Sequence, residues 1–199
     1  MILNHLWGLY AHPLEEWQTI DNRHESLRYS LSHILLIACI PSIMGYYSSV
    51  YLGWSIGAGE AVYLTHDSAL LIAVAMYFAL IAGVFALAYL AHWMAVTFGA
   101  KPTFTQTLEL AAYTATPVFR SSFAAFLPEL WFVVCVGLVA LAYSVYLLYT
   151  GVPILMHIPE ERGFIYASSV VTCGLILLVI ILAATAILWT NGIVHPMFT

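Results

Sequence analysis

Long stretches without a charged side chain dominate the pattern of the chain. No Asp, Glu, Lys or Arg occurs in any of four stretches, which cover residues 29–54, 68–100, 130–159 and 163–199. A membrane-spanning helix needs about 20 consecutive apolar residues, so each stretch can hold one span. The pattern therefore predicts helices that cross a bilayer.

The segment 104–127 is a weaker candidate for a further span. It is largely apolar, but it carries Glu109 and Arg120 and contains Pro117. A membrane helix tolerates proline where its surroundings satisfy the freed backbone groups, so we count this segment as a helix kinked near Pro117. The predicted fold is all-α, an integral membrane bundle of about five transmembrane helices at residues 29–52, 68–98, 104–127, 129–150 and 164–190.

Residues 1–28 precede the first predicted span and carry an amphipathic pattern. Leu3, Leu6, Trp7 and Tyr10 recur at the spacing of one helical face. The segment is not basic, so its attachment to a membrane would depend on apolar side chains rather than on attraction to anionic lipids. We expect residues 1–28 to form a cytoplasmic, interfacial amphipathic segment and residues 29–199 to form one transmembrane domain.

The few basic residues predict the orientation of the bundle. Arg23 and Arg28 precede the first span, Lys101 lies between the second and third, and Arg162 lies between the fourth and fifth. These segments alternate along the chain and thus share one side, and Lys and Arg are retained on the cytoplasmic side of short loops. We therefore expect a cytoplasmic N-terminus and a C-terminus on the opposite side, with Arg120 as an exception near the outer end of the third span.

Composition excludes several classes of protein. The chain is 63% hydrophobic and 8% charged, which is too little charge to cover a water-exposed surface. Its net charge of -5 offers no basic face, so nucleic-acid binding is set aside. Cys39, Cys135 and Cys173 lack paired CxxC spacing and sit in apolar stretches, so they are expected to be reduced packing residues.

Three segments carry a resemblance to a known family. They are PLEEWQTI at 13–20, AAYTATPVF at 111–119 and AYSVYLLYTGVPILMHIPEERGF at 142–164, and GWSIGAGE at 53–60 extends them. Together they resemble the Yip domain family of multipass membrane proteins, which includes Golgi and endoplasmic reticulum proteins linked to Rab GTPases, and they are closest to its bacterial branch. The resemblance implies five membrane helices in a bacterial inner membrane, with the N-terminus cytoplasmic and the C-terminus periplasmic. A bacterial host has no Rab partner, so the trafficking role is not carried over.

A polar stripe on the third predicted span is the most specific candidate site. Glu109, Tyr113, Thr116 and Arg120 recur on one helical face, and Gln106 extends the stripe. Ionisable groups at membrane depth are costly and normally face a protein interior or a water-filled cavity. In the alternative interpretation, Glu109 and Arg120 reach the two membrane surfaces, and Tyr113 and Thr116 bond neighbouring helices.

Possible partners of this stripe are His33, His92 and Glu129. Glu129 is the acidic residue nearest to Arg120 in sequence at the outer end, although Glu60 or Asp67 could replace it. Glu60 and Asp67, together with His66, could also contribute to a cation site, but no metal-ligand spacing supports this and a solvated loop is favoured.

The sequence contains neither HExxH nor a phosphate-binding glycine loop. We accordingly predict a non-enzymatic protein without catalytic residues, metal or cofactor. The first hypothesis is a bundle that binds membrane lipids, protein partners or a second copy of itself, and it predicts an outward groove. The alternative is a small transporter or channel, in which the stripe would line a polar path reaching the middle of the membrane.

Overall fold

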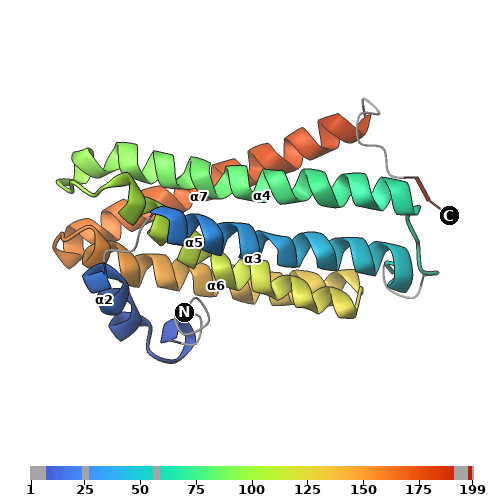
Figure 1. Ribbon diagram of the computed structural model, residues 1–199, viewed down its shortest axis with the longest axis horizontal. Helices are drawn as coiled ribbons and strands as arrows, with labels where there is room; N and C mark the ends of the chain where they lie inside the picture. Colours follow the sequence, from blue (N-terminus) through green and yellow to red (C-terminus); the bar gives the residue numbers. More distant parts are fainter. Residues whose placement is uncertain (1–7, 24–26, 56–58, 191–196, 199) are drawn as a thin grey trace.

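The computed structural model describes residues 8–23, 27–55, 59–190 and 197–198, and this part of the chain is helical with a few isolated β-bridges. Its long helices are α2 (Pro13–Arg23), α3 (Leu27–Tyr47), α4 (His66–Ala95), α5 (Phe104–Ser121), α6 (Leu130–Leu155) and α7 (Glu160–Thr190) (Figure 1). A π-helix (Ser48–Leu52) follows α3, and 3-10 turns follow α4 (Val96–Phe98) and α5 (Ser122–Phe126). The predicted all-α membrane bundle is confirmed.

Within the described residues, four segments are long and apolar enough to cross a membrane. They are Leu27–Leu52, His66–Phe98, Leu130–Leu155 and Glu160–Ile187. The remaining long helix of the bundle, α5, is less apolar and does not reach this level. The count of five spans therefore stays a prediction.

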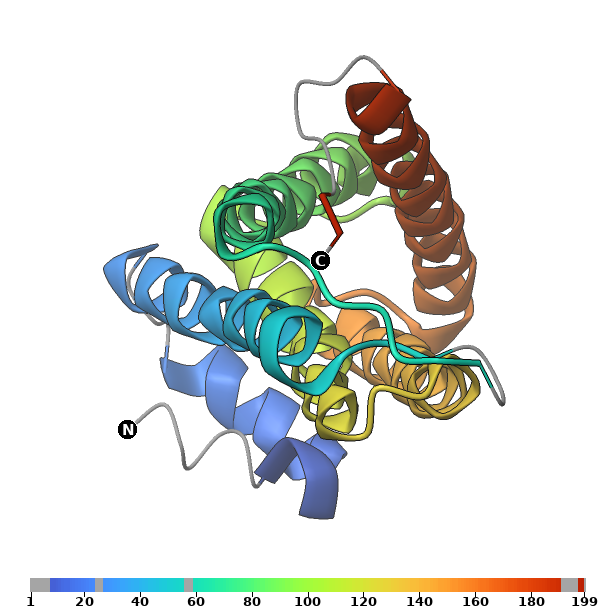
Figure 2. The same ribbon diagram turned by 90° about the vertical axis from the view of Figure 1, so that its right-hand side faces the viewer.

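Helix α5 occupies the centre of the bundle. Eleven of its 18 residues are buried, and it packs against α3, α4 and α6 (Figure 2). Its first turn is fixed by a capping box, in which the Thr103 hydroxyl accepts from the Gln106 backbone N–H and the Gln106 side chain accepts from the Thr103 N–H.

The segment 104–129, which contains α5, runs beside α6 from one end to the other. Near its start, the Gln106 amide donates to the carbonyl of Leu155 at the far end of α6, at 3.4 Å. After α5, the turn Ser122–Phe126 leads to Glu129, the residue immediately before α6. The segment from 104 to 129 consequently covers the same height as α6, in the opposite direction.

The sequence predicts that this helix ends near residue 150, and Gly151 and Pro153 favour such an end. In the structure, α6 is longer. A Cβ at Gly151 would lie 2.6 Å from the Trp17 ring, and one at Gly163 would lie 2.8 Å from Pro153. Close tertiary packing therefore holds both residues in the helix, which continues to Leu155. Helix α7 begins at Glu160 rather than 164, and Glu160 and Glu161 in its first turn complement the helix dipole.

Residues 8–23, here called the N-terminal arm, run along the half of α6 that ends at Leu155. The carboxylate of Asp21 lies 2.9 Å from Nε2 of His157, Trp17 packs on Gly151, and the Tyr143 hydroxyl donates to the carbonyl of Leu9 at 2.7 Å. Followed from Asp21 back to Leu9, the arm thus reaches the middle of α6. The predicted apolar residues Leu3, Leu6 and Trp7 lie outside the described residues.

The opposite end of the bundle holds the connection between α3 and α4. Trp54 forms a β-bridge with Val62, and Ser55 forms one with Glu129. Near the C-terminus, the carbonyl of Met197 accepts from the Thr65 N–H at 2.9 Å. We call this the tail end, and the end that carries α2 the arm end (Figure 1).

Candidate functional site

The polar stripe predicted on α5 lies in the protein interior. Glu109 is 2% exposed, and Tyr113 and Thr116 are each 1% exposed. Gln106 is partly buried, whereas Arg120 is exposed. The structure therefore places the middle of the stripe, including a carboxyl group, against neighbouring helices.

His33 of α3 joins this stripe. Its Nε2 lies 3.0 Å from Oγ1 of Thr116, and the Thr116 hydroxyl itself donates to the carbonyl of Ala112 at 2.9 Å. The Thr116 oxygen thus meets both an imidazole nitrogen of α3 and a carbonyl of its own helix. The His33 ring also lies 4.7 Å from the Tyr113 ring, between centroids.

Trp17 of the N-terminal arm closes the site from the arm end, although no sequence pattern links it to the stripe. The Trp17 side chain is fully buried and meets the Tyr113 ring edge-on, with centroids 6.2 Å apart. The buried polar atoms without a hydrogen-bond partner within the described residues include Nε1 of Trp17 and the hydroxyls of Ser30 and Ser144. We call the buried residues His33, Glu109, Tyr113 and Thr116 the polar cluster. It lies inside an otherwise apolar bundle.

The other two suggested partners lie elsewhere. The ring of His92 packs edge-on against Phe104, with centroids 6.0 Å apart. Glu129 precedes α6, where its carbonyl accepts from the N–H groups of Phe132 and Val133. Among the described residues no ion pair joins Arg120 to Glu129, so the expected pairing is absent from the structure.

Arg120 instead lies over the ring of Tyr10, with the guanidinium carbon 5.3 Å from the ring centroid. Tyr10 in turn stacks on Tyr143, with centroids 5.3 Å apart and an interplanar angle of 5°. Tyr143 stands at the middle of the 26-residue α6, so Arg120 is not at the tail end as the sequence predicted. The physical reason is that α5 ends at Ser121, and residues 122–129, a 3-10 turn followed by non-helical backbone, cover the remaining height. Burial raises the pKa of the Tyr10 phenol, and the positive charge of Arg120 partly offsets this effect.

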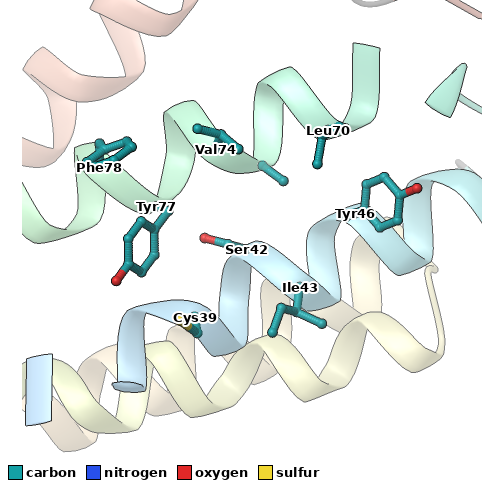
Figure 3. A pocket seen from close by; sticks show the side chains of 9 residues that line it. Cys39, Ser42, Ile43, Tyr46, Leu70, Val74, Tyr77 and Phe78 are labelled. Carbon is teal, nitrogen blue, oxygen red and sulfur yellow. The ribbon is translucent and has the colours of Figure 1, made fainter. Parts of the chain in front are cut away.

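A lateral groove of about 400 Å³ separates α3 from α4 (Figure 3). Its lining comes from Cys39, Ser42, Ile43 and Tyr46 of α3 and from Leu70, Ala73, Val74, Tyr77 and Phe78 of α4. At the tail end of the groove, the Tyr46 hydroxyl lies 3.1 Å from Nδ1 of His66. The sequence led us to expect an outward groove but could not place it, because apolar residues at spacings of three and four are common to most membrane helices.

The suggested loop cation site is not assembled. His66 is directed to Tyr46, and no group of three potential metal ligands gathers in the part of the chain that the structure describes.

Comparison with known proteins decides the family. The profile of the Yip1 domain matches residues 7–181. The chain belongs to the Yip1 domain family. This family assignment confirms the resemblance read from the three sequence segments and makes the protein a multipass membrane protein of that family.

Two similar proteins have the same name. The inner membrane protein YohC of Escherichia coli strain K12 is 36% identical over 191 residues, which cover 96% of this chain and 98% of YohC. The YohC protein of Escherichia coli O6:H1 strain CFT073 matches with the same identity and coverage. No solved structure matches the chain.

Proposed function

We propose that this Yip1 family protein is a non-enzymatic, lipid-binding protein of a bacterial inner membrane. The location is supported by its similarity to YohC, which is an inner membrane protein. Membrane lipids are the partners that the proposal names, and the groove between α3 and α4 is the observation that carries it.

The proposed topology has five spans, with the N-terminus cytoplasmic and the C-terminus periplasmic. Support for the fifth span comes from the segment 104–129, which covers the height of α6 although α5 is less apolar than the other spans. Its burial explains why it can be polar, since neighbouring helices shield it from lipid.

The charge distribution supports the same orientation. The chain has five basic residues, of which Arg23, Arg28, Lys101 and Arg162 lie near the arm end. Arg120 lies beside Tyr143 and Tyr10 rather than at the tail end, so it no longer opposes the cytoplasmic bias of basic residues.

The groove fits an acyl chain better than a polar solute. It lies on the side of the bundle, and the exposed residues Ile43, Leu70 and Phe78 along it are apolar. Its volume is within the range of about 300–1,000 Å³ that is usual for small-molecule sites. A lipid chain entering from the bilayer would fill it without removing polar groups from water.

Filling the groove tests this proposal. Ala73 is buried in the groove, so Ala73→Phe should occupy the space of the chain, whereas Ala75→Phe places the same bulk on an exposed position. Delipidated protein in detergent should gain thermal stability when phospholipid is added, because a ligand that binds the folded state stabilises it. Ala75→Phe should keep this gain and Ala73→Phe should lose it. A full gain in Ala73→Phe would exclude the groove as the lipid site.

A second candidate function is transport, and the polar cluster is the observation that favours it. An imidazole and a carboxyl group buried in one bundle are typical of proton-coupled transporters. Purified protein in liposomes would then conduct protons or small cations, and Glu109→Gln would abolish the flux. Wild-type liposomes without flux above empty liposomes would contradict this candidate.

A further inference from the structure

We propose that Arg120 binds the phosphate group of a phospholipid in the leaflet at the arm end. The inference rests on the proposed lipid-binding function, but it concerns a different place from the groove. Arg120 is exposed, and the contact that the structure gives its guanidinium is the Tyr10 ring. Within the described residues no carboxylate forms an ion pair with it.

The surface of α6 shows where the hydrocarbon of the membrane ends. Exposed residues recur along one side of α6 from Trp131 to Tyr146, and from 147 to 156 none is exposed. The exposed stripe is about 23 Å long at 1.5 Å per residue, which fits within the roughly 30 Å thickness of a hydrocarbon core. Trp131 and Tyr146 stand at its two ends, as aromatic residues do at membrane interfaces.

The N-terminal arm covers α6 beyond that stripe, from Gly151 toward His157, and its first residues reach back to Tyr143. Its outward residues include Glu15, Gln18 and Asn22, which are exposed and polar. Such side chains belong in the headgroup region rather than in hydrocarbon. The boundary between hydrocarbon and headgroups therefore passes close to Tyr146, and Tyr143, whose ring lies 5.7 Å from that of Tyr146, carries Tyr10 and Arg120 beside it.

A phosphate group is the ligand that suits this position. The guanidinium presents a planar fork of N–H donors that binds phosphate through two parallel hydrogen bonds. Stacking over Tyr10 uses the face of the guanidinium and leaves the N–H groups at its edge to donate. Because the site lies at the level of the headgroups and beside the apolar stripe of α6, the phosphate source is a phospholipid whose chains lie along α6, rather than free phosphate.

The test uses the full chain in detergent and three probes: short-chain phosphatidylglycerol, diacylglycerol of the same chain length, and inorganic phosphate. Affinity is measured from the rise in thermal stability with probe concentration. Loss of a charge-assisted hydrogen-bonded pair should weaken phosphatidylglycerol binding by roughly tenfold in Arg120→Gln. Arg28→Gln removes an exposed arginine at the start of α3 and should stay close to wild type. Arg120→Lys should bind with intermediate affinity, since lysine supplies a point charge without the fork.

Three results would overturn the proposal. They are unchanged affinity in Arg120→Gln, an equal loss in Arg28→Gln, and an equal effect of inorganic phosphate or diacylglycerol on the wild type. If Arg120→Gln fails to fold, wild-type affinity in the folded Arg120→Lys variant would also contradict the proposal. The groove is tested separately by Ala73→Phe. Loss of lipid stabilisation in that variant, with no change in Arg120→Gln, would leave the proposed function standing and remove the phosphate site.

Discussion

Helices α5 and α7 show opposite relations between polarity and burial. Helix α5 carries Glu109, Tyr113 and Thr116, yet most of its residues are buried in the protein. Helix α7 contains the most apolar of the four candidate spans, yet none of its described residues after Val170 is buried. In a membrane the lipid is as apolar as a leucine side chain, so apolarity alone does not drive a helix into the protein. Polar groups and close packing place α5 at the centre, and lipid accommodates α7.

The largest expected difference in stability is between leucine-to-alanine variants of the two helices. Leu110 of α5 is 1% exposed and Leu182 of α7 is 61% exposed. Leu110→Ala leaves a cavity and should lower the free energy of unfolding by about 2–3 kcal/mol, near the low end for buried leucines because the transfer from water contributes little here. Leu182→Ala should change it by less than about 0.5 kcal/mol. Equal losses, measured by unfolding in the same detergent, would show that α7 is also enclosed by protein.

The next largest difference in stability is expected between two glycine-to-alanine variants of α6. A Cβ at Gly151 would lie 2.6 Å from the Trp17 ring, whereas a Cβ at Gly137 would have no neighbour within 4 Å. Gly151→Ala should cost about 1–3 kcal/mol by overpacking and should loosen the N-terminal arm. Gly137→Ala should be neutral or stabilise by up to about 1 kcal/mol. Thermal unfolding of both variants checks the sign, and a neutral Gly151→Ala would mean that the arm does not dock there.

The smallest expected difference in stability is between two variants that each lose a threonine hydroxyl. The Thr116 hydroxyl hydrogen-bonds to His33 of another helix, while Thr185 of α7 donates to the carbonyl of Ile181 in its own helix. Interhelical hydrogen bonds in membranes contribute on average about 0.6 and at most about 1.7 kcal/mol. Thr116→Val should therefore cost an amount in that range and Thr185→Val close to none, with Thr116→Ser restoring stability. If Thr116→Ser is as unstable as Thr116→Val, the hydroxyl is not what matters at this position.

The sequence predicted the features that depend on local pattern. Charge-free stretches are sufficient to predict membrane helices, and the spacing of Glu109, Tyr113 and Thr116 is sufficient to place them on one face. The prediction that this face turns inward follows from the cost of an ionisable group in lipid. His33 was named as a partner on the same reasoning, and the structure brings it to Thr116.

The features that the sequence missed depend on contacts between distant segments. Gly151 and Pro153 favour a helix end, and only the packing of Trp17 on Gly151 and of Pro153 on Gly163 shows why α6 continues. The height of Arg120 could not be predicted from the sequence, because it depends on the end of the α-helix at Ser121 and on the path of residues 122–129, which combine a 3-10 turn with extended backbone at Glu129. The groove between α3 and α4 has no pattern that separates it from any lipid-facing surface.

We expect the polar segment around α5 to cross the membrane inside a shell of more apolar helices. Cysteines at Lys101 and Leu127, which flank this segment and are exposed, test it in a variant whose three native cysteines are replaced by serine. In intact cells permeabilised only at the outer membrane, an impermeant thiol reagent should label Leu127→Cys. It should label Lys101→Cys only after the inner membrane is opened. Labelling of both cysteines from the same side would show that this segment does not cross the membrane.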